Sequence, residues 1–213
     1  MAVLLVMTVL VLGVNYPGPT NAVFAEVPTL HLLALVPMTP GPSLQPPYNR
    51  GEELISAAKL AVERINMRDD ILPGYKLELI PANAETCDQS LVTDAPVNFV
   101  RHITRGDLDI VGVVGLVCST VTQAISPLAG RSEIDLLQNS AGATAPILRS
   151  KEYPRLYRMT PSSEVYNDAV LALMATFQWR RISMVHDNNL IQHTTTADNF
   201  VAKVERSSNI PKT

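Results

Sequence analysis

The sequence predicts an α/β fold, a doubly wound parallel sheet with helices on both faces. Short apolar runs alternate with amphipathic segments from Thr29 onward, and alternating strands and helices produce a covered parallel sheet. Apolar residues make up 46% of the 213 residues and charged residues 17%, a composition that forms a core. Right-handed crossovers then favour the doubly wound topology, in which ligands bind beyond the carboxyl ends of the strands.

The predicted strands are short apolar runs bounded by proline, glycine or polar residues. They cover residues 29–36, 76–80, 109–115, 134–138 and 182–186, with a further extended segment at 153–159. Pro37 ends the first strand, and Pro73-Gly74 makes the turn before the second.

The predicted helices carry apolar side chains three and four residues apart. They cover residues 52–68, 94–104, 119–131, about 162–178 and about 196–206. Asp94 and Pro96 fit a helix cap and first turn, and Ser162-Ser163 can cap the fourth helix.

Residues 1–25 are expected to be a secretory signal peptide, with an apolar run from Ala2 to Val14 and the small-residue cleavage pattern Val23-Phe24-Ala25. The alternative is a membrane anchor, but the run is shorter than the ~20 residues that a span needs. We expect residues 26–180 to form one lobe and residues 181–213 to begin a second, because one strand and one helix cannot bury a core alone. The chain is expected to be secreted or to lie on the extracellular face of the plasma membrane, with any membrane attachment through a region C-terminal to this sequence.

The composition gives little support to nucleic-acid binding or catalysis. The net charge of −3 provides no basic surface for a polyanion. The four histidines show no metal-ligand spacing, and neither a nucleophile elbow nor a phosphate-binding glycine loop is present. We therefore expect no metal, no cofactor and no enzymatic activity.

A candidate anion site lies at Cys118-Ser119-Thr120-Val121, where a strand runs directly into a helix. Unpaired backbone N–H groups and the helix dipole favour negative charge there. The loops 37–49, 116–120 and 140–146 should meet at this edge of the sheet, so Thr144 can add a second hydroxyl while Gly142 leaves room for a ligand. The alternative is that Ser119 only caps the helix and Thr144 is an ordinary loop hydroxyl.

Cys118 has one possible intrachain partner, Cys87. In a secreted chain a disulfide between them would close a loop of about thirty residues and contribute roughly 3–4 kcal/mol. The alternative is a pair of buried free thiols.

Several segments occur in the order found in the bilobed extracellular receptors. They are Leu35-Val36-Pro37-Met38-Thr39, Ala61-Val62-Glu63-Arg64-Ile65-Asn66, residues 68–77, Thr86-Cys87-Asp88, Cys118-Ser119-Thr120-Val121, residues 140–146 and residues 153–162. The chain resembles the first lobe of this family, which includes metabotropic GABA receptors, other class C G-protein-coupled receptors and natriuretic-peptide guanylyl cyclase receptors. The resemblance is greatest for the metabotropic GABA receptor branch.

The resemblance implies a type I periplasmic-binding-protein fold, in which a ligand docks on the first lobe and the second lobe closes over it. It also implies that Cys87 and Cys118 pair, that Ser119 binds a ligand carboxylate, and that Thr144 is a second hydroxyl contact. The expected ligand-binding residues are therefore Ser119, Gly142, Thr144 and Thr160. Thr160 stands where GABA-binding subunits have a histidine, and Ala141 stands where they have a tyrosine. Their tryptophan after the first strand is also absent, since the loop reads Thr39-Pro40-Gly41-Pro42-Ser43.

The expected function is therefore that of a receptor ligand-binding region for a small amino-acid-like ligand of the GABA type. The resemblance implies G-protein signalling in the full-length protein and a homo- or heterodimer through the first lobe. Two alternatives remain. One is a dimer partner that binds no ligand, and the other is the extracellular region of a natriuretic-peptide-type guanylyl cyclase receptor.

Overall fold

The computed structural model describes residues 27–38, 51–84, 87, 94–149 and 151–206. The expected signal peptide, and the loop after the first strand from Thr39 onward, lie outside these ranges. The strands are β1 (Thr29–Val36), β2 (Lys76–Asn83), β3 (Ile110–Val114), β4 (Leu137–Ser140) and β5 (Leu156–Arg158). The helices are α2 (Gly51–Asn66), α3 (Asp94–Thr104), α4 (Ser119–Ala129), α5 (Glu164–Thr176) and α6 (Ile191–Arg206).

The five strands form one sheet in the order β2-β1-β3-β4-β5, and all neighbouring strands are parallel. The chain proceeds from β1 to β2 on one side and then crosses to β3, β4 and β5 on the other. The strand order therefore reverses between β1 and β3, which is the topological switch point of a doubly wound sheet. The predicted α/β fold class is confirmed.

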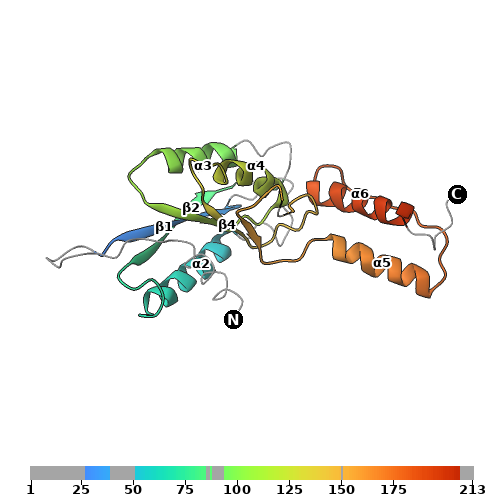
Figure 1. Cartoon of the computed structure of the whole chain (residues 1–213), viewed down its shortest axis with the longest axis horizontal. Helices are drawn as coiled ribbons and strands as arrows, with labels where there is room; N and C mark the ends of the chain where they lie inside the picture. The colour runs from blue at the N-terminus through green and yellow to red at the C-terminus, as the bar shows by residue number, and fades with distance from the viewer. Residues whose placement is uncertain (1–26, 39–50, 85–86, 88–93, 150, 207–213) are drawn as a thin grey trace.

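Two apolar clusters hold helices on opposite faces of the sheet (Figure 1). On one face, Phe99 of α3 and Ile125 of α4 are fully buried against Leu33 and Val113 of the central strands. On the other face, Ile55 and Val62 of α2 are buried among alternate residues of β1 and β2. Successive side chains of a strand point to opposite faces, so β1 supplies both clusters and is apolar at every position except Thr29 and His31.

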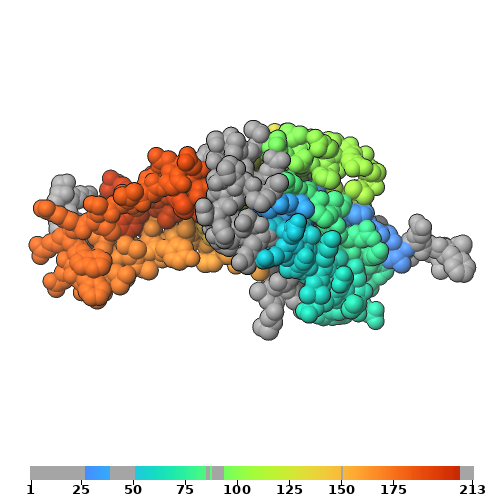
Figure 2. Space-filling model, turned by 180° about the vertical axis from the view of Figure 1, so that it is seen from behind, coloured from blue at the N-terminus to red at the C-terminus, as the bar shows by residue number. Residues whose placement is uncertain are grey.

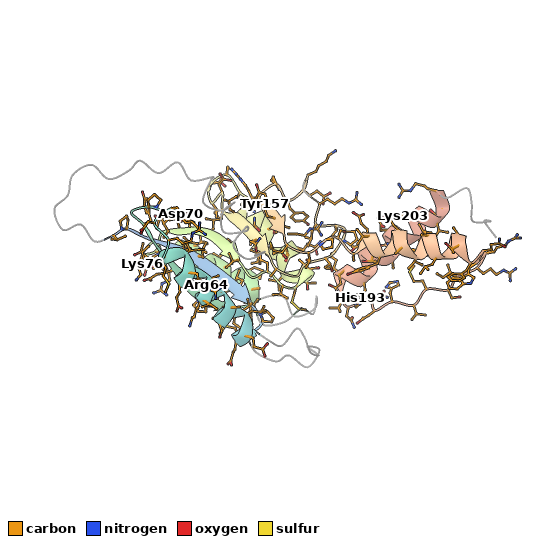
Figure 3. All side chains as sticks on the ribbon, turned by 90° about the horizontal axis from the view of Figure 1, so that it is seen from below. Arg64, Asp70, Lys76, Tyr157, His193 and Lys203 are labelled. Atoms are coloured by element: carbon orange, nitrogen blue, oxygen red, sulfur yellow. A yellow bond between two sulfur atoms is a disulfide. The ribbon has the colours of Figure 1, made fainter. Side chains whose placement is uncertain are left out.

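Helices α5 and α6 form a pair that projects away from the sheet (Figure 1). Polar groups join them, because the Asn167 amide donates to the Thr196 carbonyl at 2.9 Å and to the Asn199 side chain at 3.0 Å. The Lys203 ammonium reaches Asp168 on α5, and both His193 and Lys203 are seen on α6 in Figure 3. Several large apolar side chains of this pair are exposed, namely Val165, Tyr166, Leu173 and Val201.

The predicted boundaries of β1 and α3 agree with the structure, whereas the fourth strand was predicted too early. Residues 134–138 were expected, but β4 is Leu137–Ser140. After α4 the chain makes a turn in which the N–H groups of Ile134 and Asp135 both donate to Arg131 O. Asp135 has a φ of 47°, and this left-handed conformation cannot continue into a strand.

The predicted strand at 182–186 is wrong, since the structure assigns no strand between α5 and α6. Ile182 and Met184 are exposed and Val185 is 97% exposed, so no neighbouring strand covers the segment. An apolar run becomes a strand only when a second strand satisfies its backbone groups. The last helix also begins at Ile191, five residues before its expected start.

Candidate functional site

The site is built on the turn that joins β3 to α4. Gly115 follows β3 with a φ of 100°, and a Cβ added there would lie 2.7 Å from Leu35 O. Only glycine therefore permits both this backbone conformation and the close approach to β1. The chain then reaches Cys118, the residue before α4, which makes no side-chain capping hydrogen bond.

A disulfide joins Cys118 to Cys87, with the two Cα atoms 5.2 Å apart. The pairing that the family resemblance implies is thus present. Thr120 strengthens the same connection, because its hydroxyl donates to Cys87 O at 2.5 Å. The first turn of α4 is consequently fixed to the chain that follows β2 by one covalent bond and one hydrogen bond.

Ser119 is the first residue of α4 and is only 4% exposed. Its Oγ accepts hydrogen bonds from the backbone N–H groups of Thr144 and Ala145, both at 3.1 Å. A serine hydroxyl has two acceptor positions and one donor. The two N–H groups occupy the acceptor positions, so the Ser119 O–H is left to donate to a further acceptor.

The loop after β4 is held against the β3–α4 turn by Ser140. Its hydroxyl donates to Leu116 O at 2.6 Å and accepts from the N–H of Ala143 at 2.9 Å. Gly142 lies so close to this turn that an added Cβ would be 3.0 Å from Val117 O. The loop carrying Gly142 and Thr144 therefore lies directly beside the start of α4, as expected for neighbouring parallel strands.

The Thr144 hydroxyl points to the helix pair, where it lies 3.4 Å from Oε1 of Gln192 on α6. Thr160 lies on the connection between β5 and α5, and its Oγ1 is buried without a partner among the described residues. The structure thus brings Ser119, Gly142 and Thr144 together. It gives no described contact between Thr160 and these three residues.

The sequence did not indicate two residues that the structure places beside the site, Gln192 and Arg158. Gln192 lies on α6, which was expected to start later, so its approach to Thr144 was not foreseeable. Arg158 on β5 donates from Nη1 to Ala145 O at 3.1 Å. Burial lowers the pKa of the Arg158 guanidinium, but an arginine side chain stays charged in proteins. It therefore places a positive charge beside the loop that follows β4.

Two other kinds of site find no support in the part of the chain that the structure describes. It contains no group of three or more histidine, cysteine, aspartate or glutamate side chains placed to hold a metal ion. Among the described helices, none combines the length and the apolar character that a membrane crossing requires.

Comparison with known proteins identifies the wider relationship. Residues 54–211 match the model of the receptor family ligand binding region. The chain is 29% identical over 175 residues to gamma-aminobutyric acid type B receptor subunit 1 of Caenorhabditis elegans, which covers 82% of this chain and 18% of that protein. It is 35% identical over 134 residues to subunit 2 of Rattus norvegicus, covering 62% of this chain and 13% of that protein.

A plant protein, glutamate receptor 3.1 of Oryza sativa subsp. japonica, is 31% identical over 133 residues, covering 62% of this chain and 13% of that protein. The chain thus spans less than a fifth of the length of these relatives. Because the family model matches most of the chain, and the parallel α/β sheet is the fold expected for it, this protein belongs to the receptor family ligand binding region.

Proposed function

We propose that this chain is part of an extracellular ligand-binding region and that it binds the carboxylate of a small amino-acid-like ligand at the start of α4. The observation that carries the proposal is the Ser119 hydroxyl, which has both acceptor positions filled and its donor available. The first backbone N–H groups of α4 lack intrahelical partners, and no side chain of Cys118 caps them. A carboxylate is the natural acceptor for such a set of donors.

Electrostatics support the same ligand class. Arg158 brings a positive charge to the neighbouring loop through its hydrogen bond to Ala145 O. The names of the relatives include gamma-aminobutyric acid type B and glutamate receptors, and both named ligands are small amino acids with a carboxylate. GABA-binding subunits have a histidine and a tyrosine where this chain has Thr160 and Ala141. The proposal is therefore not restricted to GABA, and titration with several amino acids identifies the ligand.

We further propose that lobe one extends over residues 26–180 and that residues from 181 begin a second lobe, which is completed by chain outside this sequence. The relatives are more than five times longer than the matched segment, and this leaves room for such a lobe. Closure of two lobes over a ligand would shift an equilibrium between open and closed states, and that shift would be the signal passed to a G protein.

Titration calorimetry of the secreted, oxidised chain with GABA, glutamate and leucine tests the ligand proposal. The contacts that a second lobe would add are lacking, so we expect dissociation constants of about 1 mM or weaker, equivalent to about 4 kcal/mol. Substituting Ser119→Ala removes the free hydroxyl donor and should abolish the residual binding. Ser56→Ala, at an exposed position of α2, is the matched control and should leave binding unchanged. Micromolar affinity, or equal binding by the two variants, would contradict the proposal.

A dimer partner that binds no ligand is the second candidate, favoured by one observation on α3. Phe99 is fully buried, but Val97 and Val100 are 55% and 44% exposed and present an apolar face. In the full-length receptor, Ser119→Ala separates the two functions. Loss of the ligand response supports the ligand-binding role, whereas unchanged signalling by a heterodimer supports the partner role. Val97→Ser with Val100→Ser should then disrupt the dimer.

The genomic reading frame beyond Thr213 distinguishes the receptor types. We expect seven apolar spans, as in a G-protein-coupled receptor. A single apolar span followed by a cyclase domain would instead support the natriuretic-peptide type.

A further inference from the structure

The connection between α5 and α6 is exposed along its whole length. Every residue in the range 175–189 is exposed, and Val185 is 97% exposed. Over residues 179–187 the chain forms no helix, strand, turn or bend. This segment contains Arg180 and Arg181, the only adjacent pair among the 17 lysines and arginines of the sequence. Two neighbouring positive charges are thus presented to solvent on irregular backbone.

The arrangement of the two helices keeps this connection drawn out. Both helices begin beside Thr144, because the Ser163 N–H donates to Thr144 O at 2.8 Å and the Thr144 hydroxyl lies 3.4 Å from Gln192 Oε1. They therefore run in the same direction, and the connection must return along the pair (Figure 1). Since α5 has 13 residues, the return covers roughly 20 Å and favours an extended backbone.

No described group holds the connection in place. The backbone N–H and C=O groups of residues 180–186 make no hydrogen bond with any described residue, whereas the Trp179 N–H donates to Met174 O at 2.9 Å. The side chains of Arg180 and Arg181 likewise form no hydrogen bond or ion pair within the described part of the chain. The segment can therefore enter the cleft of an enzyme without breaking any of these interactions.

Other basic residues are less accessible to a protease. Those in α2, α3 and α6 lie on helical backbone, whose polar groups largely bond within the helix. Ion pairs hold the side chains of Arg68, Arg105, Arg149 and Arg155. The connection therefore combines the three properties that a substrate needs, namely exposure, extended backbone and unpaired arginine side chains.

We propose that this connection is the substrate of an endoprotease specific for paired basic residues, which hydrolyses the Arg181–Ile182 peptide bond. Water adds across the bond, so Arg181 gains a carboxylate and Ile182 gains an ammonium group. Proteins bind extended segments through main-chain hydrogen bonds, and an acidic pocket of a protease selects an arginine before the cut. Exposed loops are also where proteolytic nicking concentrates. The inference does not depend on the carboxylate site.

Cleavage should produce a two-chain molecule that stays together. Ala197 and Phe200 of α6 are 4% and 5% exposed. Ile191 packs in an apolar cluster with Ala145 of the loop after β4. The Asn167 amide of α5 also donates to two groups of α6 across the cut. These contacts fix the part after the cut to the part that carries the sheet.

Limited proteolysis of the secreted, oxidised chain in dilute solution tests the proposal. Trypsin probes access, and a paired-basic endoprotease of the secretory pathway probes specificity. Mass spectrometry should find a new N-terminus at Ile182, formed about tenfold or more faster than a cut at any other described basic residue. Arg180→Gln should slow the paired-basic enzyme about tenfold or more, while trypsin still cuts after Arg181. In native size-exclusion chromatography both fragments should elute together.

Two controls separate this site from general charge and from unfolding. Arg180→Gln with Arg181→Gln should remove the cut by both enzymes, whereas Arg64→Gln with Arg68→Gln, at the end of α2, should leave its rate unchanged. Gly106→Ala strains a glycine with a φ of 71° far along the chain from the connection. Its rate of cleavage should equal that of wild type, because the native chain is already accessible.

The proposal would be overturned by a faster first cut at another described basic residue or by equal rates in the two double variants. Wild-type cleavage of Arg180→Gln by the paired-basic enzyme would contradict the specificity. Faster cleavage of Gly106→Ala would mean that the connection is cut only after unfolding. Separation of the fragments in the native column would exclude the two-chain product.

Discussion

Ser119 has a structural role that can be measured apart from any ligand. Its Oγ is the acceptor for the N–H groups of Thr144 and Ala145, and Ala145 is fully buried. Ser119→Ala should therefore reduce the free energy of unfolding by about 1–3 kcal/mol, the cost of leaving a buried donor unsatisfied. Urea denaturation measures the change. Ser56→Ala, at an exposed position of α2, is the control and should stay within about 0.5 kcal/mol of wild type.

A wild-type midpoint in Ser119→Ala would mean that water satisfies both N–H groups and that the two hydrogen bonds to Ser119 add nothing to stability.

His102 predicts a pH dependence of stability. Burial, and then the charges of Arg105 and Arg101, lower the pKa of this imidazole below its ordinary value of 6.5. Its Nδ1 is also buried without a partner among the described residues. The unfolded chain takes up a proton at higher pH than the folded chain, so the contribution of His102 is full above about pH 6.5 and declines as the pH falls toward the folded pKa.

His102→Gln should accordingly reduce the loss of stability between about pH 7.5 and pH 5.5, followed by urea midpoints at each pH. His186→Gln, at an exposed position in the connection between α5 and α6, should behave as wild type. If His102→Gln loses as much stability on acidification as wild type, the imidazole is not the responsible group.

At the residue scale, the sequence predicts which site residues lie close together but not which hydrogen bonds they make. Ser119 and Thr144 follow neighbouring parallel strands, whose carboxyl ends meet at one edge, and this is enough to bring them together. That Ser119 accepts from two N–H groups depends on the conformation of the loop after β4, which its small residues do not specify. Gln192 and Arg158 come from elements whose relation to the site requires the complete topology.

At the scale of elements, Gly115 is the residue on which the β3–α4 turn depends. An added Cβ would approach Leu35 O to 2.7 Å and the Val36 side chain to 2.8 Å, at a φ of 100°. Gly106 also has a positive φ, 71°, but nothing lies within 4 Å of its added Cβ. The two positions therefore separate backbone strain from steric contact.

Gly106→Ala should cost about 1–2 kcal/mol from the backbone conformation alone. Gly115→Ala should cost about 1–3 kcal/mol more, because strand β1 or the turn must move. Chemical denaturation of the two variants measures both values. Equal destabilisation would show that the turn relaxes without disturbing β1.

The elements that were predicted correctly are those with strong local patterns. β1 is a mostly apolar run that ends just before Pro37, and α3 begins at Asp94 with Pro96 two residues later. The local sequence therefore determines where these elements begin or end. The start of α6 is different. The hydroxyl groups of Thr194 and Thr195 donate to carbonyls four residues earlier, at 3.1 and 2.6 Å, so they find their partners within the helix. The local sequence pattern of such a segment predicts a loop, because threonine has a low helix propensity.

At the scale of the whole molecule, the sheet and its three helices bury two cores, whereas the α5–α6 pair leaves apolar side chains exposed. This pair projects from the rest of the molecule in the space-filling view (Figure 2). Tyr166 and Phe177 are 63% and 60% exposed, and Phe177 stacks on Trp179 with ring centroids 5.3 Å apart. Exposed apolar side chains gathered in one region mark an interaction surface. The segment predicted as a strand, 182–186, adds Val185 to the same region.

We therefore expect this chain to self-associate reversibly through the α5–α6 pair, and sedimentation velocity over a range of concentrations measures it. Replacing Phe177 and Trp179 together by serine should shift the equilibrium to monomer, because the replacement removes the largest apolar area. Met67→Ser, at a 79% exposed position after α2, is the control, since an isolated exposed apolar residue is ordinary on a protein surface. A monomer at every concentration, or equal effects of the two changes, would mean that the stacked rings satisfy each other and that the pair is stable in water as it stands.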